Sequence, residues 1–289
     1  WDHVAPTRKW LGNFDESCKE HPFPSDDSAV HHLFHDGWMW QLRFENGLTS
    51  LGFVSHGGFN EKIKAGTPEQ AWACLLESKP SLAGLLSQAQ LAPFPGHVYR
   101  SGRLQRLRAC ASGVDWAALP FSAGFIDPLH STGIAHTLSG VEKLSRILFS
   151  ESGQQQVDSL KQYSQCLIDE FRLIDLLVAG CYESLANFSL FTAWTMLYFA
   201  AATTYEKKYQ QDRCDSPDFL CASEADFVEL VHQLFADLRN LPKEQSREAK
   251  QAVENFILTM RKCLVPFNHV GLFEPEIPNM YRYTSAKKH

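Results

Sequence analysis

The N-terminal part of the chain alternates between hydrophobic and polar positions, and two turn dipeptides interrupt the alternation. Asp36-Gly37 and Asn46-Gly47 separate runs rich in aromatic and β-branched residues, and both dipeptides favour the positive φ angles of a tight hairpin turn. Because strand side chains alternate between faces, Trp38 and Trp40 lie on the same face of the middle run. The pattern therefore predicts a three-stranded antiparallel meander with one aromatic face.

A helical repeat replaces this alternation farther along the chain. Thr67 and Pro68 suit the cap and the first position of a helix within 67–90. Residues His97–Arg108 and Val114–Leu119 return to a strand pattern and predict two further strands. A loop rich in small residues then leads into a helix that ends near Phe149.

From Gln154 onward, apolar residues recur at the three- and four-residue steps that mark the buried face of a helix. The positions that set this spacing are Leu160, Tyr163, Leu167, Phe171, Ile174 and Leu177. We expect a polar loop over Lys207–Asp218, followed by amphipathic helices over 223–239, capped by Ser223, and over 243–264.

Composition and charge exclude several classes of protein. With 44% hydrophobic and 21% charged residues, the chain has the composition of a globular protein, which excludes wholesale disorder. A net charge of −6 argues against a nucleic-acid binder and against a polybasic membrane anchor. Residues 184–205 carry no formal charge but include several Ser, Thr and Asn residues, so we expect a buried helix there and no membrane span.

The cysteines and the first residue give two further expectations. The eight cysteines are scattered and form no CxxC pair, which predicts reduced thiols and a cytoplasmic protein. The sequence begins at Trp1 where a complete chain would begin with Met, so we expect it to be a fragment.

The segment Ser122–Ile134 is a loop of small residues that runs into a helix. Ser131, Thr132 and Gly133 would place unpaired backbone N–H groups at the helix N-terminus, where they suit an anion or a polarised carbonyl group. Gly133 would allow a planar ligand to approach the backbone closely. An ordinary capped helix has a similar composition, so the residues alone leave ligand binding and simple capping open.

Two other groups of residues are candidates for binding. His31, His32 and His35 carry metal-binding side chains, but neighbouring strand residues point to opposite faces and no carboxylate or cysteine completes the set. We therefore expect no metal site. Trp38 and Trp40 could stack on a ligand, although aromatic residues on one strand face more often belong to a core.

Two motifs resemble those of a known family. The segment Gly124–Ile134, which reads GFIDPLHSTGI, resembles the GF(I/V)(D/E)PLxS(S/T)G segment of flavin-dependent halogenases and halogenase-like FAD oxidoreductases. Independently, Gly37–Leu42, which reads GWMWQL, resembles the WxWxIP signature of the same tryptophan-halogenase-like family. Two motifs in the family's order are more specific than either motif alone.

The resemblance implies an α+β fold, namely part of a p-hydroxybenzoate-hydroxylase-type FAD oxidoreductase. Residues 1–98 would form the substrate-side antiparallel sheet with inserted helices, 99–150 the return into the FAD domain, and 151–289 a helical cap. His130 and Ser131 would be catalytic, and Trp38 and Trp40 would line the substrate pocket. The cofactor-binding residues would be Ala123, Gly124, Phe125, Asp127, Pro128, Thr132, Gly133 and Ile134.

The resemblance also implies an activity and its partners. Such enzymes are oxidoreductases that use reduced FAD, oxygen and halide on a small organic substrate, and a flavin reductase supplies the reduced FAD. The chain lacks the GxGxxG loop that cradles the FAD pyrophosphate, so we expect this chain alone to hold FAD weakly or not at all.

Three departures from the family pattern keep alternatives open. Pro120-Phe121 stands where the family often has Gly-Asp, whose aspartate binds the flavin ribitol. Arg43 replaces the proline of the WxWxIP signature, and His130 replaces a glutamate found in tryptophan halogenases. A non-halogenating FAD-dependent oxidoreductase or monooxygenase of the same fold is one alternative. A non-catalytic remnant that acts as a binding module is the other.

Overall fold

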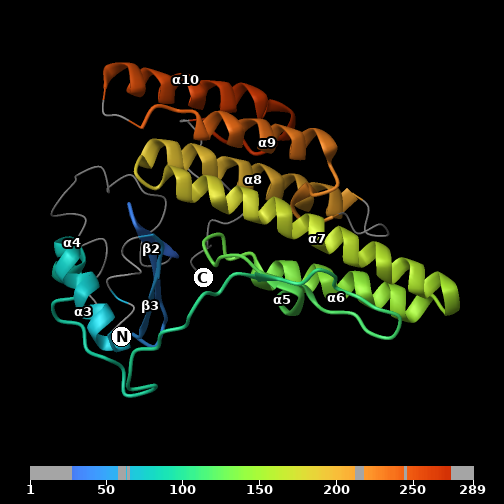
Figure 1. The fold of residues 1–289 in the computed structure, drawn as a ribbon, viewed down its shortest axis with the longest axis horizontal. Helices are drawn as coiled ribbons and strands as arrows, with labels where there is room; N and C mark the ends of the chain where they lie inside the picture. Colours follow the sequence, from blue (N-terminus) through green and yellow to red (C-terminus); the bar gives the residue numbers. More distant parts are fainter. Residues whose placement is uncertain (1–27, 58–62, 64–65, 212–217, 244–245, 275–289) are drawn as a thin grey trace. The chain divides into compact units, whose positions relative to one another are not determined.

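The computed structural model describes residues 28–57, 63, 66–211, 218–243 and 246–274. Within these residues the fold is α+β, with small antiparallel sheets and a majority of helix, as expected (Figure 1). These residues form two compact units, one within 28–102 and the other within 103–274. We call them the sheet unit and the helical unit.

The predicted meander is confirmed in the sheet unit. Strands β1 (Val30–Phe34), β2 (Gly37–Arg43) and β3 (Thr49–Ser55) pair antiparallel in the order β1-β2-β3. Gly47 has a φ angle of 82° in the second turn, and Gly37 has one of 153° where β2 begins, and both values favour glycine.

Two helices cover the sheet face that carries Met39. Helix α3 (Pro68–Ser78) begins with the expected cap, because Thr67 and Gln70 satisfy each other's backbone N–H groups in a capping box. Helix α4 (Pro80–Leu85) follows directly. Met39 packs with the buried residues Leu75, Leu82, Leu85 and Leu86. The main core of this unit therefore lies on the opposite face of β2 from Trp38.

The predicted strands over His97–Arg108 and Val114–Leu119 are wrong. The described chain has only a two-residue strand β4 (Arg106–Leu107), paired with β5 (Gly124–Phe125), and a single bridge between Ser112 and Ala117. Residues 99–110 are exposed throughout, so the alternating pattern has no core to bury one face against. Without that burial, the pattern does not produce a long strand.

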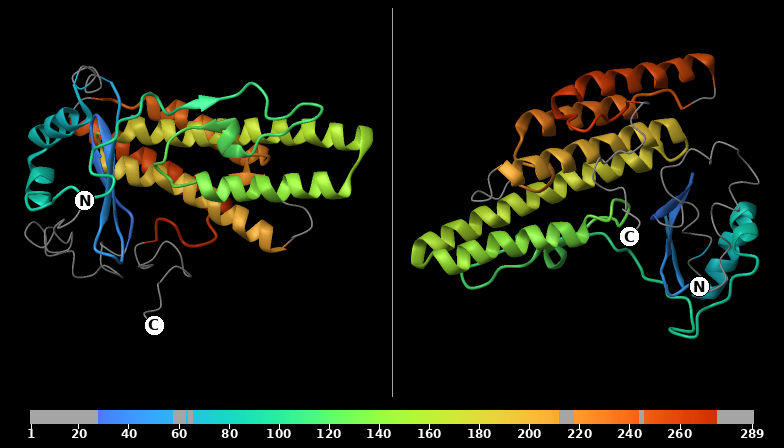
Figure 2. Two further views of the ribbon diagram at one scale, coloured as in Figure 1. Left: turned by 90° about the horizontal axis from the view of Figure 1, so that it is seen from below. Right: turned by 180° about the vertical axis from the view of Figure 1, so that it is seen from behind.

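The helical unit contains a short helix and five longer helices in its described residues. They are α5 (Pro120–Ala123), α6 (Gly133–Ser150), α7 (Gly153–Ser184), α8 (Phe188–Gln211), α9 (Ala225–Arg239) and α10 (Arg247–Cys263), with 3₁₀ turns η3 (Phe219–Cys221) and η4 (Val265–Phe267). Figure 2 shows α6 running beside the first half of α7. All six apolar positions predicted for the buried face of α7 are buried, which confirms that face.

Helix α8 packs against α7 at very short range. A Cβ atom added to Gly180 would lie 1.9 Å from the indole of Trp194, and Trp194 Nε1 donates to the Leu177 carbonyl over 2.8 Å. The uncharged stretch predicted as a buried helix therefore does pack within this unit. Across the described ranges, no helix is long and apolar enough to cross a membrane.

Three predicted helix ends are wrong by a few residues. Helix α8 continues to Gln211, into the segment predicted as a loop, of which 212–217 lie outside the described residues. Helix α9 begins after Glu224 without a side-chain cap, so Ser223 does not cap it. Helix α10 begins only at Arg247, because Ser246 Oγ accepts from the Ala249 N–H and fixes the start there.

One face of α6 is apolar and exposed, and we call it the apolar face of α6. Its first four members follow one another at steps of four, three and seven residues, and the fifth comes directly after them, so all lie on one side of the helix. They are Ile134, Leu138, Val141, Leu148 and Phe149, of which Phe149 is 90% exposed.

Candidate functional site

The loop between β5 and α6, residues 126–132, holds five of the predicted site residues: Asp127, Pro128, His130, Ser131 and Thr132. Its own bonds are few: Asp127 Oδ1 accepts from the Leu129 N–H over 2.8 Å, and the Ser131 N–H donates to the Pro128 carbonyl over 2.9 Å. Ser131 adopts a left-handed backbone with φ of 53°. As predicted, the loop joins α6 at Thr132–Gly133. The prediction that the Ser131 N–H is unpaired is wrong, because the Pro128 carbonyl accepts from it. We call this segment the β5–α6 loop.

The N-terminus of α6 lacks a side-chain cap. Thr132 occupies the cap position in a helical conformation, and its side chain makes no capping bond. The first N–H groups of a helix have no acceptor within the helix and carry the positive end of its dipole. This end of α6 therefore suits a negatively charged or polarised ligand group.

Gly133 is not required by the fold. Its φ angle is not positive, and an added Cβ atom would meet nothing nearer than a Phe121 ring carbon at 3.9 Å. Gly124 differs, since its added Cβ atom would lie 2.8 Å from the Phe171 ring. Packing thus accounts for Gly124, whereas it leaves the glycine at 133 unexplained.

Residues of α7 and α8 fasten the β5–α6 loop. The Tyr182 hydroxyl donates to Asp127 Oδ2 over 2.7 Å. The His130 ring stacks on Tyr198 with centroids 4.3 Å apart and an interplanar angle of 5°, and its Nε2 lies 3.5 Å from Cys181 Sγ. Burial raises the pKa of Cys181 to about 12, so this thiol is neutral and is no activated nucleophile. Cys181, Tyr182 and Tyr198 were not predicted as site residues.

The position expected to hold a flavin-binding aspartate carries an exposed aromatic side chain. Phe121 packs edge-on against Phe125 with centroids 5.6 Å apart. The Arg106 guanidinium lies 5.1 Å from the Phe121 ring centroid, and it donates to the Phe121 carbonyl. A phenyl ring cannot accept a hydrogen bond from a ribitol hydroxyl as a carboxylate can, so this position does not fit that role.

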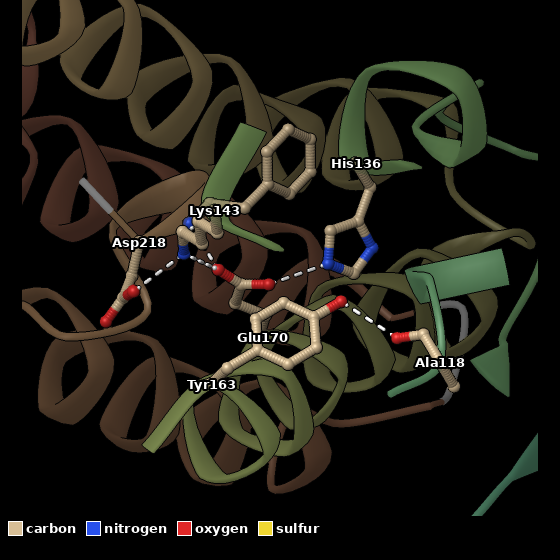
Figure 3. Close-up of polar contacts among 7 residues, drawn as sticks. Ala118, His136, Lys143, Tyr163, Glu170 and Asp218 are labelled. Carbon is tan, nitrogen blue, oxygen red and sulfur yellow. Dashed lines mark hydrogen bonds and ion pairs between the residues drawn. The ribbon is translucent and has the colours of Figure 1, made fainter. Parts of the chain in front are cut away.

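A buried charge network fixes α6 against α7 (Figure 3). Glu170 on α7 is 3% exposed, and its carboxylate lies 2.8 Å from His136 Nε2 and 2.7 Å from Lys143 Nζ, both on α6. Lys143 also pairs with Asp218 over 2.8 Å, and the Phe219 N–H donates to Glu170. These contacts set the position of α6 within the helical unit.

The charges of this network support one another. Burial by itself raises the pKa of Glu170, but the His136 contact and the Lys143 charge outweigh burial and hold that pKa below its usual range. Burial by itself lowers the pKa of Lys143, yet the Glu170 and Asp218 carboxylates together raise it. Both groups are therefore charged at neutral pH.

Comparison with known proteins assigns the chain to a family. The family model described as "Tryptophan halogenase" matches residues 17–185, which is more than half of the chain. The chain belongs to the tryptophan halogenase family. This confirms the resemblance that the two sequence motifs indicated.

Curated relatives of this tryptophan halogenase family member are halogenases. The chain is 25% identical over 198 residues to tetracycline 7-halogenase of Kitasatospora aureofaciens, covering 65% of this chain and 35% of that protein. It is 26% identical over 231 residues to flavin-dependent halogenase armH5 of Armillaria mellea, covering 77% of this chain and 43% of that protein. The chain thus spans about two fifths or less of these relatives.

Solved structures show the same fold. A variant of halogenase PltM in complex with FAD matches with a TM-score of 0.76 and 19% identity, covering 97% of this chain and 59% of that one. PltM in complex with phloroglucinol and FAD matches with a TM-score of 0.72 and 20% identity. The family member described here therefore has the fold of the corresponding part of PltM.

Trp38 and Trp40, from the second family motif, lie in the sheet unit. Trp38 is 1% exposed and lies 4.9 Å from the His31 ring centroid. Trp40 donates from Nε1 to Ser50 Oγ over 3.2 Å. Their role at a substrate pocket stays a prediction.

The His32 side chain bonds Gln41 over 3.0 Å, and no group of three or more possible metal ligands occurs within the ranges the structure describes.

Proposed function

We propose that this chain is the substrate-side and helical part of a flavin-dependent halogenase-like oxidoreductase that uses reduced FAD, oxygen and halide on a small organic substrate. The observation that carries the proposal is the uncapped N-terminus of α6, which begins at a glycine that the fold does not need. Bound FAD would supply the redox chemistry and the activation of oxygen, and a flavin reductase would supply reduced FAD.

The residues around this helix end support the proposal. A reduced flavin carries negative charge on one edge of its ring, and the first N–H groups of α6 would stabilise that charge. Gly133 would let the ring approach the backbone. The other predicted cofactor contacts are Ala123, Gly124, Phe125, Asp127, Pro128, Thr132 and Ile134. His130 and Ser131 would be the catalytic residues of the same loop.

The proposal extends to the fold type and the organisation of the chain. We assign a p-hydroxybenzoate-hydroxylase-type fold with a substrate-side sheet over 1–98, a return into the FAD domain over 99–150 and a helical cap over 151–289. The described cysteines are all free thiols, which supports a cytoplasmic location.

Two features limit how tightly this chain alone can bind FAD. It contains no GxGxxG loop for the pyrophosphate, and Phe121 offers no acceptor to the ribitol. Both carboxylate oxygens of Asp127 already accept hydrogen bonds, from Leu129 and Tyr182. Each carboxylate oxygen can accept more than one hydrogen bond, so Asp127 can support the loop and stays a predicted cofactor contact. The chain alone should bind FAD weakly or not at all.

A second candidate function is a FAD-dependent oxidoreductase or monooxygenase that does not halogenate. It is favoured by His130, which stands where tryptophan halogenases carry a carboxylate. The His130 ring packs against Tyr198 and Cys181. A non-catalytic binding module is the third candidate function.

The test uses the complete protein that contains this chain and compares Gly133→Ala with Gly84→Ala. We expect the wild type to bind FAD and, with reduced FAD, oxygen and bromide, to brominate phenolic or indolic probes detected by mass spectrometry. Gly133→Ala should weaken FAD binding about tenfold or more while the unfolding temperature stays unchanged. Gly84 also has space for a Cβ atom and lies in α4, so Gly84→Ala should leave FAD affinity unchanged.

Each outcome separates the candidates. Flavin binding with substrate oxidation but no bromination would support the second candidate. A wild type without flavin would support the binding module. Equal FAD affinity in wild type and Gly133→Ala would show that the helix end does not contact the cofactor.

A further inference from the structure

The β5–α6 loop cannot hold its shape through its own bonds alone. Its internal contacts include the Asp127–Leu129 and Ser131–Pro128 hydrogen bonds, both of which involve backbone groups of the loop itself. Ser131 is a non-glycine residue in the left-handed region, a conformation that persists only where surrounding contacts enforce it. The loop therefore depends on contacts from other elements.

The Asp127 carboxylate links the loop backbone to the last turn of α7. One oxygen accepts from the Leu129 N–H over 2.8 Å, and the other accepts from the Tyr182 hydroxyl over 2.7 Å. Hydrogen bonds to an ionised carboxylate are among the stronger ones in proteins. Fixing this carboxylate fixes the turn that precedes Ser131 and the start of α6.

The anchor is separate from the packing that holds the helices together. Tyr182 lies close to the C-terminal end of α7, whereas the buried charge network joins α7 to α6 through Glu170. His130 adds a second anchor through its stack on Tyr198 of α8. Loss of the Tyr182 hydroxyl therefore leaves the charge network intact.

We propose that Tyr182 is a positioning residue for the flavin-facing end of α6, acting through Asp127. The proposal rests on the proposed function, because it concerns the same loop and helix end. The C-terminal helices thereby set the distance between the α6 N–H groups and the ligand, although Tyr182 itself need not touch that ligand.

The first test measures hydrogen exchange in the 289-residue chain. Tyr182→Phe should raise the exchange rate of amides in residues 126–135 about tenfold, because the carboxylate loses a charge-assisted bond. The control is Tyr163→Phe on the same helix, which removes a hydroxyl bond to the Ala118 carbonyl. It should leave exchange in that loop unchanged. Unchanged exchange in Tyr182→Phe, or an equal rise in both variants, would overturn the proposal.

The second test measures FAD binding by the complete protein. Tyr182→Phe should weaken FAD binding about tenfold and shift the absorption band of the bound flavin, while its unfolding temperature stays close to that of the wild type. The control Tyr163→Phe should bind FAD with nearly the affinity of the wild type. Asp127→Ala should have an effect similar to that of Tyr182→Phe, and the double variant should be no worse than either single variant.

The two hypotheses fail differently. A wild type that binds no flavin would overturn the proposed function, and the exchange measurement would still decide whether Tyr182 fixes the loop. A wild type that binds flavin, with Tyr182→Phe matching it in affinity and absorption, would overturn the positioning role alone.

Discussion

Glu170 is a carboxylate on the buried face of α7, next in sequence to the buried Phe171. A buried charge is costly unless partners replace its lost hydration. Here His136, Lys143 and the Phe219 N–H supply that replacement. A charged residue within an apolar helix face was the one sequence signal that could have revealed this network.

We expect Glu170→Gln to lower the free energy of unfolding by about 3 kcal/mol, because Lys143 and His136 would stay buried without their shared anion. The control is Asp169→Asn on the same helix, which removes a carboxylate paired with the exposed Arg172 and should cost under about 1 kcal/mol. Urea denaturation of both variants measures the difference. Equal losses of unfolding free energy in the two variants would show that the buried ion pairs of Glu170 contribute no more than the exposed pair of Asp169.

The pH dependence of unfolding gives a second readout of the same variant. Because the pKa of Glu170 is lowered, its contribution is complete above the ordinary carboxyl pKa of about 4.3. That contribution is lost as pH falls through the lower folded value. The raised pKa of Lys143 gives a contribution that is lost only as pH rises through a value above about 10.4. Glu170→Gln should flatten the acid side of this profile.

At the level of elements, the close approach of α7 and α8 depends on Gly180. Gly180→Ala should lower the free energy of unfolding by about 1–3 kcal/mol, because the added methyl group would overlap the buried Trp194 indole. Gly133→Ala, in the same unit, places its methyl group in free space and should not destabilise the protein. Thermal unfolding of both variants measures the difference. Equal losses of unfolding free energy would contradict the close packing of α7 against α8.

Sequence patterns predicted those elements well whose structure depends on a few neighbouring residues. The Gly37 and Gly47 turns and the Thr67 cap act over four residues or fewer, so they were readable. The exposed segment 99–110 was mispredicted because an alternating pattern becomes a strand only when a partner buries one of its faces. That partner is not visible in the local sequence.

For the molecule as a whole, the family was readable from two motifs, whereas the structure around the candidate site was not. The Asp127–Tyr182 bond joins residues 55 positions apart, and the Lys143–Asp218 pair spans 75 positions. Such contacts follow from how helices pack, which no local pattern encodes. The sequence thus indicated which loop to propose as the cofactor-binding one, but not which contacts hold that loop in place.

The apolar face of α6 has a practical consequence for handling the purified chain. Exposed apolar patches promote self-association, so we expect the 289-residue chain to bind a hydrophobic dye and to form oligomers as salt rises. Leu138→Lys with Phe149→Lys should reduce both effects. Leu258→Lys replaces a solitary exposed leucine on α10 and should change neither. Light scattering across a salt series measures this, and a wild type that stays monodisperse would contradict it. Charged substitutions on this face are therefore the first route to a colloidally stable sample.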